Sequence, residues 1–335
     1  MNDRRGTMAL SALGLLFLFL LGQFGYSYLK ISEIVSELAD AGQQSKAYRH
    51  HVVLISQELD NPFWRTIGKA AEEAAKDYNM ELEYVGPFRL NPMEQTKLLD
   101  KMIASRVDGI LVQGVDTDEY KRLINKAIER HIPVITVDTD SPDSSRLTYV
   151  GTDNRASGHK LGEVVIESLR KEPGAAMRNR IGVIIGSAEA ANQQQRLEGF
   201  KAAVGAEPYM PIAGVAVSNI SRIQAAQAAE SLLREHPDIN VMVGLSALDA
   251  VGILQAVKVL GMQDRVRIFG FDDLEETKAA IAKGEIVATV IQKPEEMGRE
   301  AVRQLHAYFG SGELAPYHFT SHEVLDRSNV GVMEP

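Results

Sequence analysis

The sequence contains no cysteine among its 335 residues. This absence excludes disulfides, thiolate metal ligands, thiol nucleophiles and lipidation on cysteine. It is compatible with a protein that works outside the cell membrane, where an unpaired thiol would be a liability. Clusters of lysine and arginine are also absent, and the formal net charge is −9. A broad nucleic-acid-binding surface is therefore disfavoured, because it would need such clusters.

Sequence signatures of several kinds of enzyme are missing too. No Gly-x-Gly-x-x-Gly follows the first predicted strand, and neither Gly-x-x-x-x-Gly-Lys-Ser/Thr nor Gly-x-Ser-x-Gly occurs. The eight histidines form no metal-binding motif. His318 and His322 are four residues apart, but their segment is predicted to be extended rather than helical. We therefore expect no catalytic residues, no cofactor and no metal.

The N-terminus is rich in hydrophobic residues. Arg4 and Arg5 precede the apolar stretch Met8–Leu21, and the hydrophobic segment continues to Leu29. This length is close to the roughly 20 residues that span a bilayer, and the two arginines predict a cytoplasmic N-terminus. A cleaved signal peptide is the alternative, but no small-x-small cleavage site directly follows. We therefore favour an uncleaved transmembrane anchor helix, followed by a juxtamembrane helix over Lys30–Tyr48.

Beyond the N-terminus, short apolar runs rich in β-branched residues alternate with amphipathic segments. The predicted strands are Val52–Ser56, Leu82–Val85, Gly109–Gln113, Pro133–Val137, Arg180–Ile185, Ile212–Val217, Val241–Leu245, Val266–Phe271 and Ile286–Ile291. Continuous apolar runs are typical of strands buried on both faces, and their alternation with helices predicts parallel sheets. Two successive sets of such elements fit two doubly wound α/β lobes of ordinary domain size.

Polar and aromatic side chains follow four of these strands. They are Asn61, Phe63 and Trp64 after the first strand, and Asp138, Asp272 and Gln292 after three others. Ligands bind at the carboxyl ends of strands in open α/β sheets. Carboxylates, carboxamides and aromatic rings together suit a small, neutral, polyhydroxylated molecule, whose hydroxyls both donate and accept hydrogen bonds.

Each of these residues also has a structural interpretation. Asn61 could cap the helix that follows it. Phe63 and Trp64 point in different directions, so at least one of them could be ordinary core packing. Asp138 could stabilise a turn, and Asp272 could cap a helix. We keep both aspartates as candidates, because each has an acidic neighbour that can cap while the other acid faces a ligand.

Six short motifs lie in a characteristic order. They are Asn61-Pro62-Phe63-Trp64, Ile132-Pro133-Val134-Ile135-Thr136-Val137-Asp138, Gly151-Thr152-Asp153-Asn154, Arg196-Leu197-Glu198-Gly199-Phe200, Gly270-Phe271-Asp272 and Ala288-Thr289-Val290-Ile291-Gln292-Lys293-Pro294. Together they resemble the periplasmic sugar-binding proteins of the ribose/galactose type, which are related to the ligand domains of lactose-repressor-like regulators. Each motif is weak alone, but their order and spacing are specific, and the resemblance extends from about His51 to Val332.

The resemblance implies the fold of a type I periplasmic binding protein, in which two lobes joined by three crossing segments enclose a monosaccharide. It implies a first lobe of residues 50–152 plus about 293–320, and a second lobe of residues 153–292 plus about 321–335. Residues 1–49 then hold the membrane anchor or signal and the juxtamembrane helix.

The resemblance also assigns roles at the sugar site. The residues are Asn61, Phe63, Trp64, Asp138, Asp272 and Gln292. The asparagine would hydrogen-bond a hydroxyl, the two aromatic rings would be walls, and the aspartates and the glutamine would accept hydrogen bonds from hydroxyls. Hydrogen bonds to carboxylates are about twice as strong as neutral ones, so two carboxylates can orient a neutral ligand.

The sequence departs from the ribose-type pattern. The arginine that follows the first aspartate is Thr139 here, and an arginine of the second lobe falls at Gln194. An Asn-Asp pair after a later strand is replaced at Ser246, and an aromatic position falls near Ile220. The new polar contacts that we expect come from Thr139, Asn192, Gln194 and Ser246. A hexose, or a pentose other than ribose, is the expected ligand.

The function that follows is that of an extracytoplasmic solute-binding protein, which closes two lobes around a monosaccharide and breaks no bond. Its partner would be the permease of an ABC transporter or a sensor histidine kinase, and the anchor favours sensing. The protein would lie on the outer face of the cell membrane, or be secreted or periplasmic if the N-terminal helix is cleaved. The alternatives are an α/β enzyme acting on a small polar substrate, and a lactose-repressor-like regulator without its DNA-binding domain.

Overall fold

The computed structural model describes residues 21–32, 50–171, 179–188 and 190–331. The chain divides into two units, Met1–Arg49 and His50–Pro335. In the first unit, residues 21–32 form a helix whose side chains are exposed.

The predicted anchor falls partly outside the described residues: residues 8–20 are not described, and residues 21–29 are. Of Met8–Leu21 only Leu21 is described, and of Lys30–Tyr48 only residues 30–32. Among the described residues, no helix is both long enough and apolar enough to cross a membrane. The transmembrane anchor therefore stays a prediction from the sequence.

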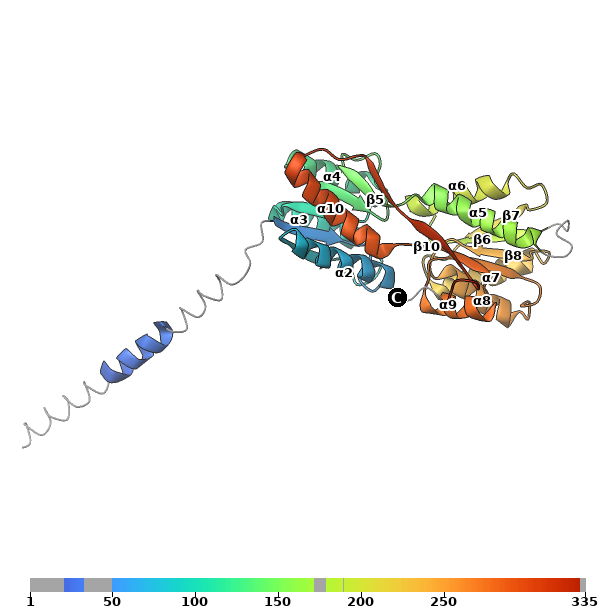
Figure 1. Ribbon diagram of the computed structural model, residues 1–335, viewed down its shortest axis with the longest axis horizontal. Helices are drawn as coiled ribbons and strands as arrows, with labels where there is room; N and C mark the ends of the chain where they lie inside the picture. The colour runs from blue at the N-terminus through green and yellow to red at the C-terminus, as the bar shows by residue number, and fades with distance from the viewer. Residues whose placement is uncertain (1–20, 33–49, 172–178, 189, 332–335) are drawn as a thin grey trace, which may run out of the picture. The chain divides into compact units, whose positions relative to one another are not determined.

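The second unit consists of two α/β lobes, each built on a six-stranded sheet (Figure 1). Across the first sheet the strands are, in order, β11 (Tyr317–Thr320), β5 (Thr148–Thr152), β4 (Val134–Val137), β3 (Gly109–Val112), β1 (His50–Ile55) and β2 (Met80–Val85). All neighbouring strands of this sheet are parallel. Its helices are α2 (Pro62–Asp77), α3 (Pro92–Ser105), α4 (Asp118–Glu129) and α10 (Pro294–Ser311).

The second lobe repeats this architecture with one difference. Its strands are, in order, β12 (His322–Asp326), β10 (Ala288–Gln292), β9 (Arg267–Phe271), β8 (Val241–Gly244), β6 (Ile181–Ile185) and β7 (Ile212–Val217). Strand β12 runs antiparallel to β10, whereas the other neighbours are parallel. The helices are α5 (Asn154–Arg170), α6 (Ala191–Val204), α7 (Arg222–Glu235), α8 (Asp249–Val259) and α9 (Glu275–Lys283). The prediction of two α/β lobes with largely parallel sheets is confirmed.

The central strands are mostly apolar because helices cover both faces of each sheet. In β1, Val52 and Leu54 belong to the core that includes side chains of α2 and α10. Their neighbours Val53 and Ile55 belong to the core that includes side chains of α3 and α4. Since successive side chains of a strand point to opposite faces, a run without polar residues is what this arrangement requires.

Prolines fix where three helices of the first lobe begin. Helices α2, α3 and α10 each have a proline in the first turn, where the missing N–H costs no hydrogen bond. The side chains of Asn61 and Asn91 cap the first two of these helices. These local signals therefore set the residue at which each helix begins.

The chain changes sheets three times, between β5 and α5, between β10 and α10, and between β11 and β12. Figure 1 shows the strand segments that run between the lobes. Helix α10 approaches α2 so closely that a Cβ atom added at Gly298 would lie only 2.3 Å from the carbonyl oxygen of Ile67. From the three changes of sheet, we propose the lobe boundaries that the resemblance implies, at about residues 152, 292 and 320.

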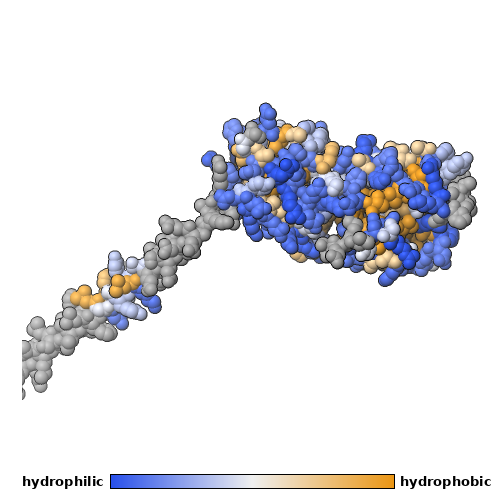
Figure 2. All heavy atoms as spheres, in the orientation of Figure 1, coloured by the Kyte–Doolittle hydropathy of each residue, from blue (hydrophilic) through white to orange (hydrophobic). Residues whose placement is uncertain are grey.

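The surface of the second unit is mostly hydrophilic in the view of Figure 2. Several large hydrophobic side chains are nevertheless exposed, and two groups of them are close in sequence. Phe88, Leu90 and Met93 lie around the loop before α3, and Val215 and Val217 lie on the edge strand β7. Scattered exposed hydrophobic residues are ordinary for a folded protein, so the functional site is better sought where polar groups are buried.

Candidate functional site

Asp138 follows β4 in an unusual backbone conformation, with φ at +63°. Its amide bonds the carbonyl of Val150 at 3.0 Å, and its carbonyl accepts a bond from the hydroxyl of Tyr149 at 2.8 Å. Its carboxylate accepts hydrogen bonds from Gln113 Nε2 and from Thr139 Oγ1, both at 3.1 Å. Neighbouring groups therefore hold Asp138 in a left-handed backbone conformation, which is uncommon for residues other than glycine.

Asp272 repeats this arrangement in the second lobe. It follows β9 with φ at +66°. Its amide bonds the carbonyl of Val290 and its carbonyl accepts a bond from Thr289 Oγ1, both at 2.8 Å. Its carboxylate accepts a bond from Gln292 Nε2 at 2.9 Å. Each lobe thus presents one left-handed aspartate at a strand end, with its carboxylate bonded by a glutamine.

The neighbouring acid Asp140 has the structural role that was an alternative for Asp138. Asp140 Oδ1 accepts bonds from the amide of Ser141 at 2.7 Å and from Thr136 Oγ1 at 2.7 Å. Its carboxylate also forms a two-point ion pair with Arg146, at 2.6 and 2.7 Å. Asp140 thus stabilises the turn. Among the described residues, the carboxylate of Asp138 accepts hydrogen bonds from Gln113 and Thr139 only.

One buried arginine, Arg196, interacts electrostatically with both Asp138 and Asp272. Burial raises the pKa of Asp138 and of Asp272 to about 6 each, and the positive charge of Arg196 opposes this rise in both cases. Arg196 is only 2% exposed. Its guanidinium carbon lies 3.6 Å from the ring centre of Phe271, the residue before Asp272. The two carboxylates therefore share one cation, which favours their ionised form.

The two lobes touch at the predicted site. Asn192, in the first turn of α6, donates from Nδ2 to Thr139 Oγ1 at 3.0 Å. Both side chains are buried. The structure therefore brings Thr139 and Asn192 together with Asp138 across the two lobes, as a shared ligand site requires.

Several buried polar atoms at this site make no hydrogen bond to the described residues. They are Ser246 Oγ, Gln292 Oε1 and Arg196 Nε. Ser246 is 4% exposed and Gln292 is 6% exposed, so neither side chain is well solvated. An unpaired buried polar group costs about 1–3 kcal/mol. A ligand rich in hydroxyls could satisfy Ser246 Oγ and Gln292 Oε1, because each hydroxyl donates and accepts.

Four other predicted residues, Asn61, Phe63, Trp64 and Gln194, have local contacts that bear on their predicted roles. Asn61 caps α2 by accepting a bond from the amide of Phe63 at 3.0 Å, and both residues are half-buried. Trp64 is 3% exposed and lies in the first-lobe core. Gln194 donates to the carbonyl of Ala188 in the preceding loop at 2.6 Å. Of the two aromatic residues, Phe63 is therefore the better placed to meet a ligand.

Gln113 is a further candidate for the site that was not predicted from the sequence. It directly follows β3, is 8% exposed and donates to the carboxylate of Asp138. Its Oε1 atom accepts a bond from the amide of Gln57 at 3.0 Å, which fixes the orientation of its side chain. The same rule that selected the aspartates, a polar side chain at a strand end, would have selected Gln113 as well.

Ile220, in the second lobe, has a strained backbone conformation. Its φ is +53°, which is a genuine outlier for a β-branched residue. A Cβ atom added at Gly186 would lie 3.0 Å from Ser246 Cβ and 3.1 Å from Ile220 Cγ1. Ile220 and Ser246 therefore lie side by side over Gly186, at the edge of the sheet where β6, β7 and β8 end.

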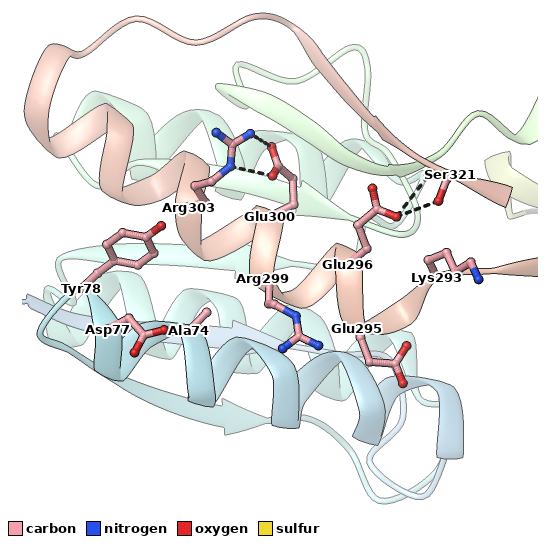
Figure 3. A pocket seen from close by; sticks show the side chains of 10 residues that line it. All are labelled: Ala74, Asp77, Tyr78, Lys293, Glu295, Glu296, Arg299, Glu300, Arg303 and Ser321. Atoms are coloured by element: carbon pink, nitrogen blue, oxygen red, sulfur yellow. Dashed lines mark hydrogen bonds and ion pairs between the residues drawn. The ribbon is translucent and has the colours of Figure 1, made fainter. Parts of the chain in front are cut away.

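A separate hollow of about 520 Å³ lies between α2 and α10 on the first lobe (Figure 3). Lysine, arginine, aspartate and glutamate side chains line it, and none of the predicted site residues does. Glu296 of α10 accepts bonds from the amide and the hydroxyl of Ser321, at 3.3 and 2.9 Å. This contact ties α10 to the segment between β11 and β12, so the hollow lies beside a crossing between the lobes.

Residues 52–313 match the periplasmic binding protein domain family. The chain therefore belongs to this family, and the resemblance that its motifs predicted is confirmed. The family consists of solute-binding proteins, and the protein is accordingly a binding protein and not an enzyme.

Relatives of known structure or function cover most of the chain. The glucose-galactose binding protein GanP from Geobacillus stearothermophilus is 39% identical, with a TM-score of 0.78 over 84% of this chain and 98% of that one. XylFII, solved alone and in a XylFII-LytSN complex, is 32% identical, with a TM-score of 0.75 over 83% of this chain and 98% of that one. The D-ribose/D-allose-binding protein of Pseudomonas aeruginosa is 24% identical over 79% of this chain and 82% of its own length.

Proposed function

We propose that the protein binds one neutral monosaccharide between its two lobes. The observation that carries this proposal is the matched pair of left-handed aspartates, Asp138 and Asp272, each bonded by a glutamine and both influenced by Arg196. The proposed contacts are Asn61, Phe63, Gln113, Asp138, Thr139, Asn192, Ser246, Asp272 and Gln292. Trp64 and Gln194 stay outside this set, because one lies in the core and the other bonds a loop carbonyl.

The chemistry of the site suits hydroxyl groups. Ionised carboxylates accept strong hydrogen bonds from sugar hydroxyls, and the side chain of Ser246 can both donate and accept. The half-buried ring of Phe63 offers a face for the apolar side of a sugar ring. A net charge near −1 from two carboxylates and one guanidinium disfavours an anionic ligand.

Within this class, we propose a hexose of the glucose or galactose kind, or a pentose other than ribose. The departures at Thr139, Ser246 and Ile220 from the ribose-type pattern support this choice. So does the 39% identity to a protein named as a glucose-galactose binding protein.

The proposed mechanism is lobe closure without chemistry. The sugar binds the closed arrangement more tightly than any open one, and this difference in affinity shifts the population towards the closed form. The Thr139–Asn192 bond joins the lobes in that form. The closed protein then presents a surface that an open one lacks, and a membrane partner can recognise it.

Two kinds of partner fit this mechanism: the permease of an ABC sugar transporter, and a membrane sensor kinase. Solute-binding relatives named as import proteins, such as the ribose import binding protein of Escherichia coli at 24% identity, support the first. The XylFII-LytSN complex, at 32% identity, supports the second. We propose that the protein works outside the cytoplasm, and that residues 8–29 anchor it there. Mass spectrometry of the mature N-terminus tests the anchor, because cleavage would remove this segment.

Calorimetric titration of the full chain tests the ligand class. The panel is D-glucose, D-galactose, D-xylose, L-arabinose, D-ribose and D-allose. We expect at least one sugar to bind, and Asp138→Asn or Asp272→Asn to weaken it about tenfold or more, because a charge-assisted bond is lost. The exposed Asp143→Asn is the control and should bind normally. Tight binding of an amino acid or nucleoside, with no response to any sugar, would overturn the proposal.

A further inference from the structure

A continuous chain of polar contacts runs from the second lobe to Asp138. Arg196 donates from one terminal nitrogen to the carbonyl of Leu245 at 2.6 Å and from the other to Asn154 Oδ1 at 2.7 Å. Asn154 Nδ2 lies 3.4 Å from the hydroxyl oxygen of Tyr149, and that hydroxyl lies 2.8 Å from the carbonyl oxygen of Asp138. Three side chains thus connect two strand ends that belong to different sheets.

These three side chains are buried, and two glycines lie in close contact with the residues that carry them. Tyr149 and Asn154 are each 3% exposed and Arg196 is 2% exposed. A Cβ atom added at Gly151 would lie only 2.4 Å from the Tyr149 hydroxyl oxygen. One added at Gly158 would lie 2.0 Å from the carbonyl oxygen of Arg196. Because solvent cannot replace the contacts of such deeply buried groups, each lost partner leaves a polar atom unsatisfied.

The chain of contacts follows one of the crossings between the lobes. Tyr149 lies on β5 of the first sheet, and Asn154 is the first residue of α5, just beyond the crossing. Arg196 lies on α6 of the second lobe. One end meets the backbone of the left-handed Asp138, and the other lies against Phe271, next to the left-handed Asp272.

We propose that Tyr149, Asn154 and Arg196 form a positioning relay that keeps Asp138 and Asp272 aligned for one sugar across the crossing segment. None of the three needs to touch the ligand. The relay rests on the proposed sugar-binding function, and it adds residues whose effect on affinity is indirect.

Electrostatics give the relay a second measurable effect. The charged or ionisable groups that influence Arg196 are Asp138, Asp272, Asp249 and the hydroxyl of Tyr149, and Asp273 influences Asp272 in turn. Arg196 lowers the pKa of both ligand-facing aspartates against the effect of burial. Loss of the guanidinium should therefore raise both pKa values further. Sugar affinity, which needs the ionised carboxylates, would then begin to fall at a higher pH than in the wild type.

The test is a set of titrations on the full chain, with the sugar that the wild type binds, from pH 5 to pH 8. Tyr149→Phe keeps the ring and removes one hydroxyl, so we expect affinity to fall about threefold to tenfold with an unchanged pH profile. Arg196→Met should weaken binding more than tenfold and move the acid limb to higher pH. Arg196→Lys keeps the positive charge but lacks the two terminal N–H donors of the guanidinium. Affinity should therefore fall, while the pH at which binding is lost on the acid side stays near its wild-type value.

The double variant decides whether these residues act as a unit. In a relay, Tyr149→Phe adds little once Arg196→Met or Arg196→Lys is present, so the combined loss is smaller than the product of the single losses. Arg180→Met is the matched control: Arg180 is a partly buried arginine of the same lobe that pairs with Asp238. It should change neither affinity nor pH profile.

The outcomes separate the relay from the site itself. If the wild type binds a sugar and the single losses multiply in the double variant, or Arg196→Met leaves the pH profile in place, the relay is refuted and the proposed function stands. If the wild type binds no sugar, both proposals fall. Arg196→Lys folds more readily than Arg196→Met because it keeps the buried charge, so the cycle can be completed with lysine alone.

Discussion

The two left-handed aspartates, Asp138 and Asp272, lie in energetically costly environments. Backbone in this region costs about 1–3 kcal/mol for most residues, and a buried carboxylate adds a desolvation cost. Both costs are met at equivalent places in the two lobes, at the ends of β4 and β9. Such a coincidence is expected of a binding site, where stability is given up for ligand contact.

Asp272 should therefore make the free protein less stable at neutral pH. Its pKa rises from 3.8 to about 6 on burial, so the folded state binds its proton more tightly than the unfolded state does. The resulting cost is absent below about pH 4, grows between pH 4 and 6, and is complete above that range. We expect Asp272→Asn, without sugar, to be more stable than the wild type by up to about 3 kcal/mol at pH 7 and nearly equal at pH 4.

Urea unfolding at the two pH values measures this difference. Asp143→Asn, an exposed position, should show no pH-dependent gain. An Asp272→Asn variant that loses more stability at pH 7 than at pH 4 would contradict this prediction, because it would mean that the fold stabilises the ionised carboxylate.

Sequence reasoning found these aspartates because a polar residue at the end of an apolar strand is conspicuous. It missed Gln113 because that residue was read as the last position of the strand rather than the first beyond it. Arg196 stood out only as part of a short motif, because a basic residue in a helix does not reveal which face is buried. Only the close approach of α5 and α6 turns Arg196 inward, and that approach depends on glycines whose role is invisible without coordinates.

At the scale of elements, the core strands were predictable from the sequence, but the C-terminal strands β11 and β12 were not. The runs at β1, β3, β4 and β8 are wholly apolar over the core, and their predicted ranges overlap the observed strands. Strands β11 and β12 were predicted only as extended chain near the C-terminus. Each is short and half-exposed, so its residues carry little hydrophobic signal. Their places come from pairing with β5 and β10, which are distant in sequence.

The packing of α5 on α6 gives a prediction with an internal control. A Cβ atom at Gly158 would lie 2.0 Å from the carbonyl oxygen of Arg196, whereas one at Gly310 in α10 would have open space. Gly158→Ala should destabilise the fold by about 2 kcal/mol or more, because backbone must move. Gly310→Ala should stabilise it by about 0.5–1 kcal/mol, because alanine favours a helix over glycine.

Thermal unfolding of both variants measures this contrast. Changes of the same sign at the two positions would show that helix propensity, and not the close contact, governs Gly158. Gly158→Ala should also weaken sugar binding, since it displaces the backbone of Arg196.

At the scale of the whole molecule, the bond between Thr139 and Asn192 is a direct contact between the two lobes at the proposed site. Removing its donor in Asn192→Ala should leave the fold of each lobe intact. We expect sugar affinity to fall about threefold to tenfold, because a neutral hydrogen bond of the closed form is lost.

Small-angle X-ray scattering with and without sugar measures the accompanying change. The variant should need more sugar than the wild type to reach the same compaction. Asn125→Ala removes a comparable bond within one lobe, between Asn125 Oδ1 and the amide of Ser145, and should leave the sugar dependence unchanged. Equal sugar dependence in all three proteins would show that the Thr139–Asn192 bond does not contribute to closure.

Each carboxylate at the site is oriented by strands of its own lobe, Asp138 by Tyr149 and Gln113 and Asp272 by Thr289 and Gln292. The groups that orient each carboxylate can thus be left in place while the proposed site is altered elsewhere. A mutant library limited to Ile220 and Ser246 would change the second-lobe side of the proposed site and keep the Gln113–Asp138 and Gln292–Asp272 bonds. This separation makes the scaffold a suitable starting point for a biosensor.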